Sequence, residues 1–125
     1  MNVVTVIDPI SNKKYDAYFS REVWIATTDY RLDKDRRMQP NGMVEHVTFT
    51  LDKMWVPTTK YFGDNIIRGG YPLIIKDKKE TYLGLVEQVD IATHDGDRAL
   101  LNVRLQEVPE LKFAERVDEI VTKRG

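Results

Sequence analysis

The chain has 125 residues, with 19 basic and 20 acidic side chains and a formal net charge of −1, so no overall field attracts nucleic acid or an anionic membrane. A hydrophobic content of 42% and a charged content of 31% indicate one globular domain, residues 1–125, and exclude a disordered chain. The absence of cysteine excludes disulfide frameworks, zinc–thiolate sites, iron–sulfur clusters and thiol nucleophiles.

The N-terminal stretch MNVVTVIDPISNKK predicts a short strand from Val3 to Ile7, ended by the turn signal Asp8-Pro9. The stretch has no basic leader and its apolar run is too short for a signal peptide. No window of the chain approaches the roughly 20 apolar residues of a membrane-spanning helix. We therefore expect a soluble protein that does not enter a membrane and is cytoplasmic when synthesised.

The next segments are mostly of strand type. Residues 15–28 (YDAYFSREVWIATT) are rich in aromatic and β-branched residues and predict one bent strand or two shorter ones. Residues 29–42 (DYRLDKDRRMQPNG) are densely charged and predict a long exposed loop. In residues 43–51 (MVEHVTFTL), apolar and polar residues alternate, which predicts a strand with Met43, Val47, Phe49 and Leu51 on one face and His46, Thr48 and Thr50 on the other.

The middle of the chain is less regular. Between Asp52 and Gly70 the pattern is blurred, with a strand end at Trp55-Val56-Pro57 and either a helical turn or a loop over residues 60–67. The stretch YPLIIK, residues 71–76, predicts a short strand, and its proline lies near the start, where a strand tolerates it best. A charged turn follows at residues 77–79.

The clearest feature is a hairpin around THDGDR, residues 93–98. Two alternating runs, 81–92 and 99–108, flank it. A three-residue loop of His94, Asp95 and Gly96 brings the apolar residues of both runs onto one face, whereas a two-residue Asp95-Gly96 turn does not. We predict the three-residue loop, with Gly96 in the left-handed position that favours glycine.

The chain ends in a predicted helix over residues 109–124. Pro109 suits the first helical position, and an acidic residue near the start and basic residues near the end match the helix dipole. Apolar residues recur at helical spacing and predict packing on the sheet, or alternatively docking on a neighbouring subunit. The whole pattern predicts a mainly β fold, a small β-barrel or β-sandwich of six to seven strands with a C-terminal helix.

No catalytic, metal-binding or cofactor-binding constellation is found in the sequence. The two histidines, His46 and His94, lie in no nucleophile or metal-ligand pattern. Asp33 and Asp35 are interleaved with basic residues, as in a solvated loop. The pair Gly69-Gly70 lacks the lysine and spacing of a phosphate-binding loop. We therefore expect a protein that is not an enzyme and needs no cofactor.

Two groups of basic residues are the candidate interaction sites. The first lies in the long loop and the second at the charged turn: Arg31, Lys34, Arg36 and Arg37, then Lys76, Lys78 and Lys79. Aromatic side chains could serve as stacking platforms for bases beside them: Tyr15, Tyr18, Phe19, Trp24, Tyr30, Tyr61, Phe62 and Tyr82. Such a combination is typical of OB-type modules that bind single strands. The interspersed acidic residues disfavour nucleic acid as the partner.

Residues 82–108, YLGLVEQVDIATHDGDRALLNVRLQEV, contain a G-x-V-x-x-V strand that turns at a polar loop and returns with alternating apolar residues. This segment resembles the strand–turn–strand ending of β-sandwich tail-tube and baseplate proteins of tailed bacteriophages. The likeness covers 27 of the 125 residues, and the chain departs from it where a helix follows. The resemblance implies a ring-forming virion component that acts by packing and edge pairing.

We therefore expect a non-enzymatic assembly protein, a phage-type virion or tail component that contacts other protein subunits. Its long polar loop and the segment 52–70 are larger than a minimal barrel needs, and such loops commonly become ordered on a partner. Two alternatives remain open from the sequence. One is an OB-like protein that binds single-stranded nucleic acid, and the other is a small phage-type protein that binds and regulates a host protein.

Overall fold

A computed structural model describes residues 2–27, 30–40, 42–58 and 67–124 of the chain. Eight strands and one helix are present in this part. In chain order they are β1 (Asn2–Ile7), β2 (Lys14–Thr27), β3 (Tyr30–Leu32), β4 (Met38–Pro40), β5 (Met43–Pro57), β6 (Pro72–Lys76), β7 (Thr81–Asp95), β8 (Arg98–Glu107) and α2 (Glu110–Arg124).

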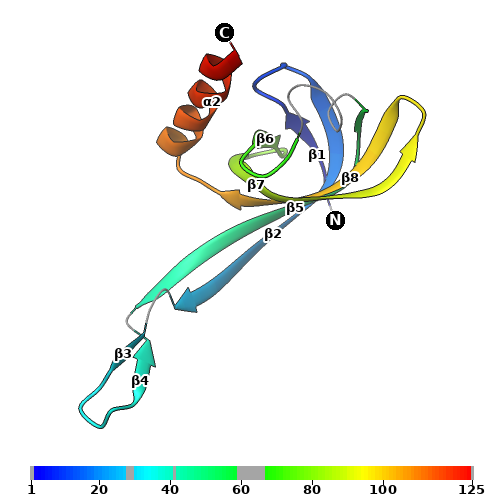
Figure 1. The fold of residues 1–125 in the computed structure, drawn as a ribbon. Helices are drawn as coiled ribbons and strands as arrows, with labels where there is room; N and C mark the ends of the chain where they lie inside the picture. The colour runs from blue at the N-terminus through cyan, green and yellow to red at the C-terminus, as the bar shows by residue number, and fades with distance from the viewer. Residues whose placement is uncertain (1, 28–29, 41, 59–66, 125) are drawn as a thin grey trace.

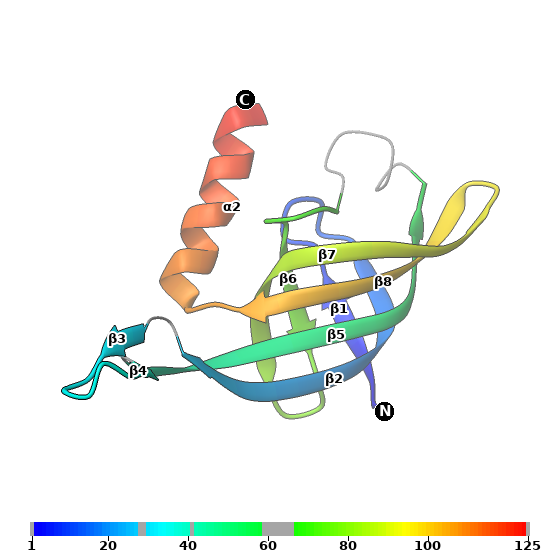
Figure 2. The same ribbon diagram turned by 60° about the horizontal axis from the view of Figure 1, so that its bottom comes forward.

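Six of the strands form a closed ring, which confirms the mainly β fold. Each strand pairs with antiparallel neighbours in the order β1-β2-β5-β8-β7-β6, and β6 pairs with β1 again. The remaining two strands, β3 and β4, form a separate hairpin. Figures 1 and 2 show the ring with α2 beside it and a long two-stranded projection that carries the hairpin. Of the two predicted architectures, the closed barrel describes this sheet and the two-layer sandwich does not.

The inside of the ring is filled by the apolar residues that alternate along the strands. Phe49 and Leu51 are fully buried, as the period-two pattern predicted, and Phe19 and Tyr82 pack against the Phe49 ring at centroid distances of 5.6 and 5.2 Å. The core residues on the strands are Val4, Val6, Ala17, Phe19, Phe49, Leu51, Met54, Val56, Leu73, Ile75, Val86, Ala99, Leu101, Val103 and Leu105. Burial of this apolar surface is the main force that holds the ring closed.

One strand is as long as predicted and one is longer. β2 is a single strand of 14 residues, the first of the two alternatives predicted for residues 15–28, whereas β5 runs for 15 residues to Pro57, beyond the expected end at Leu51. An irregularity between Leu51 and Met54 hid this continuity, because it shifts the alternation of inward and outward residues. Lys53 lies in it with φ +56, and its backbone N–H donates to Asn102 Oδ1 at 3.1 Å. The expected turn or loop over residues 60–67 lies almost wholly outside the described residues.

The turn between β7 and β8 differs from the predicted one. Gly96 and Asp97 form a two-residue turn closed by the pair Asp95 and Arg98, so the predicted three-residue loop is wrong. Gly96 has φ +61, the left-handed conformation for which a glycine was expected.

A two-residue turn with an unbroken ladder would not bring the apolar residues of β7 and β8 onto one face. Two irregularities in β7 shift the pairing and bring these residues onto the same face. They lie between Val86 and Gln88 and between Ile91 and Thr93. As a result, Val86 faces Leu105 in the core. A pattern that assumes an unbroken ladder cannot find this register, because each bulge moves the following residues by one position.

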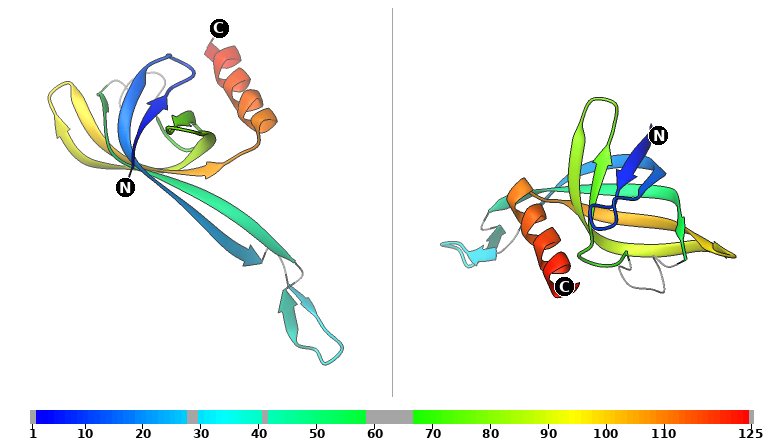
Figure 3. Two further views of the ribbon diagram at one scale, coloured as in Figure 1. Left: turned by 180° about the vertical axis from the view of Figure 1, so that it is seen from behind. Right: turned by 90° about the horizontal axis from the view of Figure 1, so that it is seen from above.

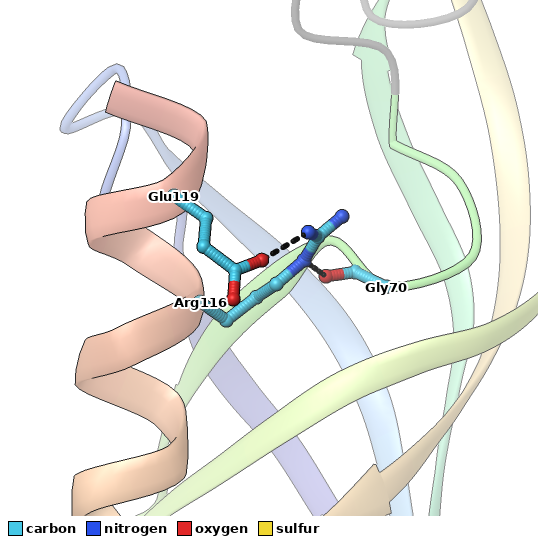
Figure 4. A network of polar contacts seen from close by, with 3 residues as sticks. All are labelled: Gly70, Arg116 and Glu119. Carbon is cyan, nitrogen blue, oxygen red and sulfur yellow. Dashed lines mark hydrogen bonds and ion pairs between the residues drawn. The ribbon is translucent and has the colours of Figure 1, made fainter. Parts of the chain in front are cut away.

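The predicted C-terminal helix is confirmed as α2. Of its apolar stripe, Phe113 is buried and Val117 is half-buried, whereas Leu111 and Val121 are exposed. Polar contacts add to the docking of the helix on the ring. The Arg116 guanidinium donates to the Gly70 carbonyl through Nε and pairs with Glu119 through Nη1, both at 2.8 Å (Figure 4).

A buried carboxylate lies beside the seam where the ring closes. Asp8, which directly follows β1, is fully buried and accepts the hydroxyl proton of Tyr71 at 2.8 Å. It also accepts the backbone N–H groups of Ile10 and Ser11. The Tyr15 hydroxyl is buried nearby with no hydrogen-bond partner among the described residues, and burial, followed by the Asp8 charge, raises the pKa of Tyr15 to about 12.

Among the residues that the structure describes, α2 included, no helix is both long and apolar enough to span a lipid bilayer.

Gly84 lies where an added Cβ atom would crowd its neighbours, and this gives a test of the core. A Cβ atom there would lie 3.0 Å from Leu105 Cβ and 3.3 Å from a ring carbon of Phe49. We expect Gly84→Ala to lower the free energy of unfolding by about 1–3 kcal/mol, because overpacking forces side chains off their rotamers. Gly69→Ala is the matched control, since its Cβ would meet nothing closer than 3.9 Å. Equal urea midpoints for the two variants would contradict the packing described for Gly84.

The two tyrosines near Asp8 should respond in opposite ways to loss of their hydroxyls. Tyr71→Phe removes a donor to a buried carboxylate and should cost about 1.5–3 kcal/mol in urea unfolding. Tyr15→Phe removes an unpartnered buried hydroxyl and should leave stability unchanged or higher.

The pH dependence of stability gives a second test of Tyr15. The pKa of Tyr15 is raised from 10.0 to about 12 in the folded state. The stability that this raised pKa contributes to the folded state is therefore fully present below pH 10 and is lost as the pH rises toward 12. Tyr15→Phe should remove this alkaline loss, which unfolding curves between pH 9 and pH 12 would measure. An unchanged pH profile in the variant would contradict the assignment.

Candidate functional site

A two-stranded projection, which we call the arm, is the most distinctive surface of the molecule. It comprises residues 21–27 of β2, residues 43–47 of β5 and the β3–β4 hairpin at their end. Strand β1 pairs with β2 only as far as Phe19, and β8 pairs with β5 only from Thr48 onward. Beyond these points β2 and β5 pair with each other alone. The opposite views in Figures 1 and 3 show the arm leading away from the ring.

One face of the arm continues the core of the ring outward. Directly opposite residues of an antiparallel pair lie on the same face, so Val23 shares a face with Val47, and Arg21 with the buried Phe49. Ile25 follows on this face and is 63% exposed. Val47 still packs on the core, whereas Val23 and Ile25 lie beyond it. The apolar interior of the ring therefore extends onto a ribbon that water reaches.

The other face of the arm is also apolar. The exposed Trp24 stacks on His46 across the ribbon, with ring centroids 4.5 Å apart and planes at 17°. Its indole Nε1–H donates to Thr48 Oγ1 at 3.0 Å. Ala26 lies opposite the exposed Val44 on the same face. The arm thus carries apolar side chains on both of its faces.

The β3–β4 hairpin lies where a long exposed loop was predicted over residues 29–42; residues 34–39 are exposed as expected, but the prediction missed the two short strands. Asp33 organises the turn: its Oδ1 accepts the backbone N–H groups of Asp35 and Arg37, at 2.9 and 2.8 Å. Its Oδ2 accepts from Gln39 Nε2 at 3.2 Å. The bond from Arg37 is the largest cause that lowers the pKa of Asp33, with smaller contributions from Asp35 and Gln39, while desolvation opposes them.

The hairpin also presents apolar side chains. Leu32 lies opposite Met38, and the two are 63% and 61% exposed. Together with Val23, Trp24, Ile25 and Val44, this pair extends the exposed apolar surface along the length of the arm.

The structure separates the two groups of basic residues that the sequence proposed as interaction sites. Lys34, Arg36 and Arg37 are exposed at the tip of the β3–β4 hairpin, and Arg31 belongs to β3. Lys76, Lys78 and Lys79 are exposed at the end of β6 and in the turn after it, on the ring itself. Figure 3 shows the hairpin and this turn at different ends of the molecule, so they do not form one basic patch.

Most of the proposed stacking aromatics are not free platforms. Phe19 is buried and Tyr15 and Tyr82 pack on the core, while Tyr18 and Trp24 are exposed. Tyr61 and Phe62 lie outside the described residues, as does the side chain of Tyr30. Trp55 was not among the predicted platforms; it is exposed, with the Arg98 guanidinium 4.2 Å from its ring centroid. Its outward position follows from the β5 irregularity, which has no signature in the pattern.

An open groove of about 670 Å³ crosses the outer face of the ring. It lies beside the Lys53 irregularity and is lined by Tyr18, Asp52, Lys53, Ala92, Leu100 and Asn102. The Lys53 ammonium lies 5.6 Å from the centroid of the Tyr18 ring. An aromatic side chain, a cation and polar groups thus line one groove, which is the second candidate surface of the molecule.

The histidines lie apart, His46 on the arm and His94 near the end of β7. In the described part of the chain, no group of three or more histidines, aspartates or glutamates is arranged to hold a metal ion. The THDGDR segment is the tip of the β7–β8 hairpin, as its turn residues predicted.

No protein-family model matches the chain, and a search of curated proteins finds no similar sequence.

The role of Asp33 in the hairpin can be tested by titration. Its lowered pKa means that the carboxylate stabilises the turn above pH 3.8 and loses this effect as the pH falls through the folded-state pKa. We expect the amide proton resonance of Arg37 to titrate with a midpoint below 3.8 in NMR spectra, and this titration to disappear in Asp33→Ala. Asp35→Ala is the control and should leave it in place. A midpoint at or above 3.8 would contradict the bonding described for Asp33.

Proposed function

We propose that the protein is a non-enzymatic assembly protein, a phage-type virion or tail component, whose arm makes the contact between subunits. One observation carries the proposal: the arm has exposed apolar side chains on both faces, and no segment among the described residues covers either face. Val23 and Ile25 lie on one face, Trp24 and Val44 on the other, and all four are exposed.

The physical cost of such an arm supports this proposal. A two-stranded ribbon alone is at best marginally stable in water, since it lacks a third strand or a layer to bury its side chains. The consecutive apolar residues from Val23 to Ala26 have the composition of a strand covered on both faces, not of one facing water. Contiguous exposed apolar surface in a soluble protein commonly marks a protein interface. A neighbouring subunit would supply the missing cover.

The charge of the arm also favours a protein partner. Residues 21–47 contain five basic and five acidic side chains, Arg21, Arg31, Lys34, Arg36 and Arg37 against Glu22, Asp29, Asp33, Asp35 and Glu45. Binding of phosphate groups depends on a net positive surface, which this balance does not provide.

A second candidate function is the binding of single-stranded nucleic acid, and the groove on the outer face of the ring is the observation that favours it. Tyr18 and Lys53 line the groove. Trp55 and Arg98 lie on β5 and β8, two strands that also contribute residues to the groove. Aromatic stacking combined with cations is how OB-type surfaces hold bases without sequence preference. Asp52 also lines the groove and Asp90 lies on β7 beside it, and these negative charges weaken this candidate.

Ile25→Lys tests the proposed assembly. Ile25 lies opposite Glu45, so the new lysine has an acidic neighbour and the monomer should fold. The loss of one buried isoleucine, worth about 1.5–3 kcal/mol, should weaken association about tenfold or more. Val121→Lys is the matched control, because Val121 is 50% exposed on α2, away from the arm. Light scattering after size exclusion, over a range of protein concentrations, would measure the mass.

The same experiment with a single-stranded oligonucleotide separates the candidates. An oligomer that ignores the oligonucleotide and is lost in Ile25→Lys alone supports assembly. A monomer that shifts only with oligonucleotide, and only at low salt, would replace assembly with the groove function. A monomer that is unaffected by either would overturn both and leave the binding of a host protein.

A further inference from the structure

The arm has one long unpaired strand edge. Over residues 21–27, strand β2 pairs with β5 on one side, and no described strand pairs with it on the other. The corresponding free edge of β5 is shorter, residues 43–47, because β8 pairs with β5 from Thr48. Each free edge presents backbone N–H and C=O groups that can accept a further strand.

The β2 edge lacks the features that usually prevent strand addition. Its pairing with β5 runs without a register shift, so no bulge turns the edge away. Residues 21–27 contain no proline and no lysine, and their two charged residues, Arg21 and Glu22, lie together at the base. The rest of the edge is Val23-Trp24-Ile25-Ala26-Thr27, a sequence of high β-propensity. Soluble proteins normally protect an edge of this kind.

We propose that this edge pairs with the same edge of a second copy of the chain, antiparallel and about a two-fold axis through Trp24. The two arms then form a four-stranded sheet in the order β5-β2-β2-β5. This inference rests on the proposed assembly function and names its partner. Antiparallel pairing of one edge with itself gives a closed dimer, the commonest symmetric assembly.

The register follows from the side chains. Centred on Trp24, the pairing places Val23 of one copy opposite Ile25 of the other, and Trp24 opposite itself. Such aromatic and β-branched pairs stabilise antiparallel strands. Centred on Val23, it would place Arg21 opposite Ile25 and Glu22 opposite Trp24. The first register joins apolar side chains on both faces and is therefore favoured.

A second copy fits this edge better than a partner of another kind. Residues 21–27 match themselves under the two-fold rotation, which requires no second sequence. The arm carries equal numbers of positive and negative side chains, so two arms do not repel each other. The β5 edge is less suitable, because centring it on Glu45 would place two like charges opposite each other.

Disulfide trapping tests the pairing in the otherwise unchanged protein, which contains no cysteine. In the proposed register, residue 22 of one copy lies opposite residue 26 of the other, on the face that bears Trp24. The double variant Glu22→Cys/Ala26→Cys should therefore be converted to a covalent dimer by oxygen with copper–phenanthroline, seen as a doubled mass on a non-reducing gel. Within one chain the two positions are about 13 Å apart along the strand, too far for a disulfide.

The single variants Glu22→Cys and Ala26→Cys are the matched controls and should form little covalent dimer, because each cysteine lies far from the same position in the second copy. Equal cross-linking of a single variant and the double variant would overturn the register. An oligomer that depends on Ile25, but in which the double variant does not cross-link, would overturn this inference and leave the proposed assembly intact. A wild-type protein that is monomeric at all concentrations would overturn both.

Hydrogen exchange of the unmodified chain gives an independent measurement. Backbone amides within residues 21–27 that face the free edge should exchange more slowly in concentrated than in dilute protein, since pairing protects them. Amides of α2 serve as the internal reference. Exchange of the edge amides that does not change with concentration would overturn the pairing, whether or not the cysteine variants fold.

Discussion

The unequal lengths of the ring strands are the constraint on which the rest of the structure depends. β2 and β5 have 14 and 15 residues, but β1 has only six, and β8 pairs with β5 only from Thr48 onward. A closed sheet satisfies the backbone groups of a strand only where both neighbours are present. The excess length of β2 and β5 must therefore leave the ring, and it leaves as a ribbon with two free edges. The arm, the exposed side chains on it and the β3–β4 hairpin all follow from this mismatch.

The ring and the arm bury their apolar residues very differently. In the ring, alternation places every second residue inside, and the outward positions are mostly polar. In the arm there is no inside, yet Val23, Trp24 and Ile25 are consecutive. The Trp24 indole is already held by His46 and Thr48, so this face is ordered before any partner arrives. Side chains that are ordered in advance lose less conformational entropy on binding.

The sequence predicted the parts of the fold that depend on local pattern. The mainly β architecture, the alternation at Phe49 and Leu51, the left-handed Gly96 and the C-terminal helix are all present. It could not predict what depends on pairing across the sheet. The irregularities in β5 and β7 shift the register, and no residue type in the sequence indicates where they occur. Residues 29–42 were assigned to a loop on their charge, but Asp33 uses that charge to close a hairpin turn.

The candidate site was missed for a related reason. The sequence indicated basic residues as candidate sites, among them those at the hairpin tip, whereas it gave no role to the consecutive apolar residues of β2 except Trp24. A run of this kind indicates cover on both faces without saying which molecule provides it. Only the pairing pattern, in which β1 stops at Phe19, shows that this cover does not come from β1.

The closing seam of the ring has a consequence for the order of folding. β1 meets β6 through only three residue pairs, and the adjacent Asp8 and Tyr71 are 63 positions apart in the chain. Contacts between such distant residues form late, because the loop entropy must be lost before they contribute. The hairpins β2–β5 and β7–β8 form from nearer residues. We therefore expect the seam between β1 and β6 to be the last part of the ring to close.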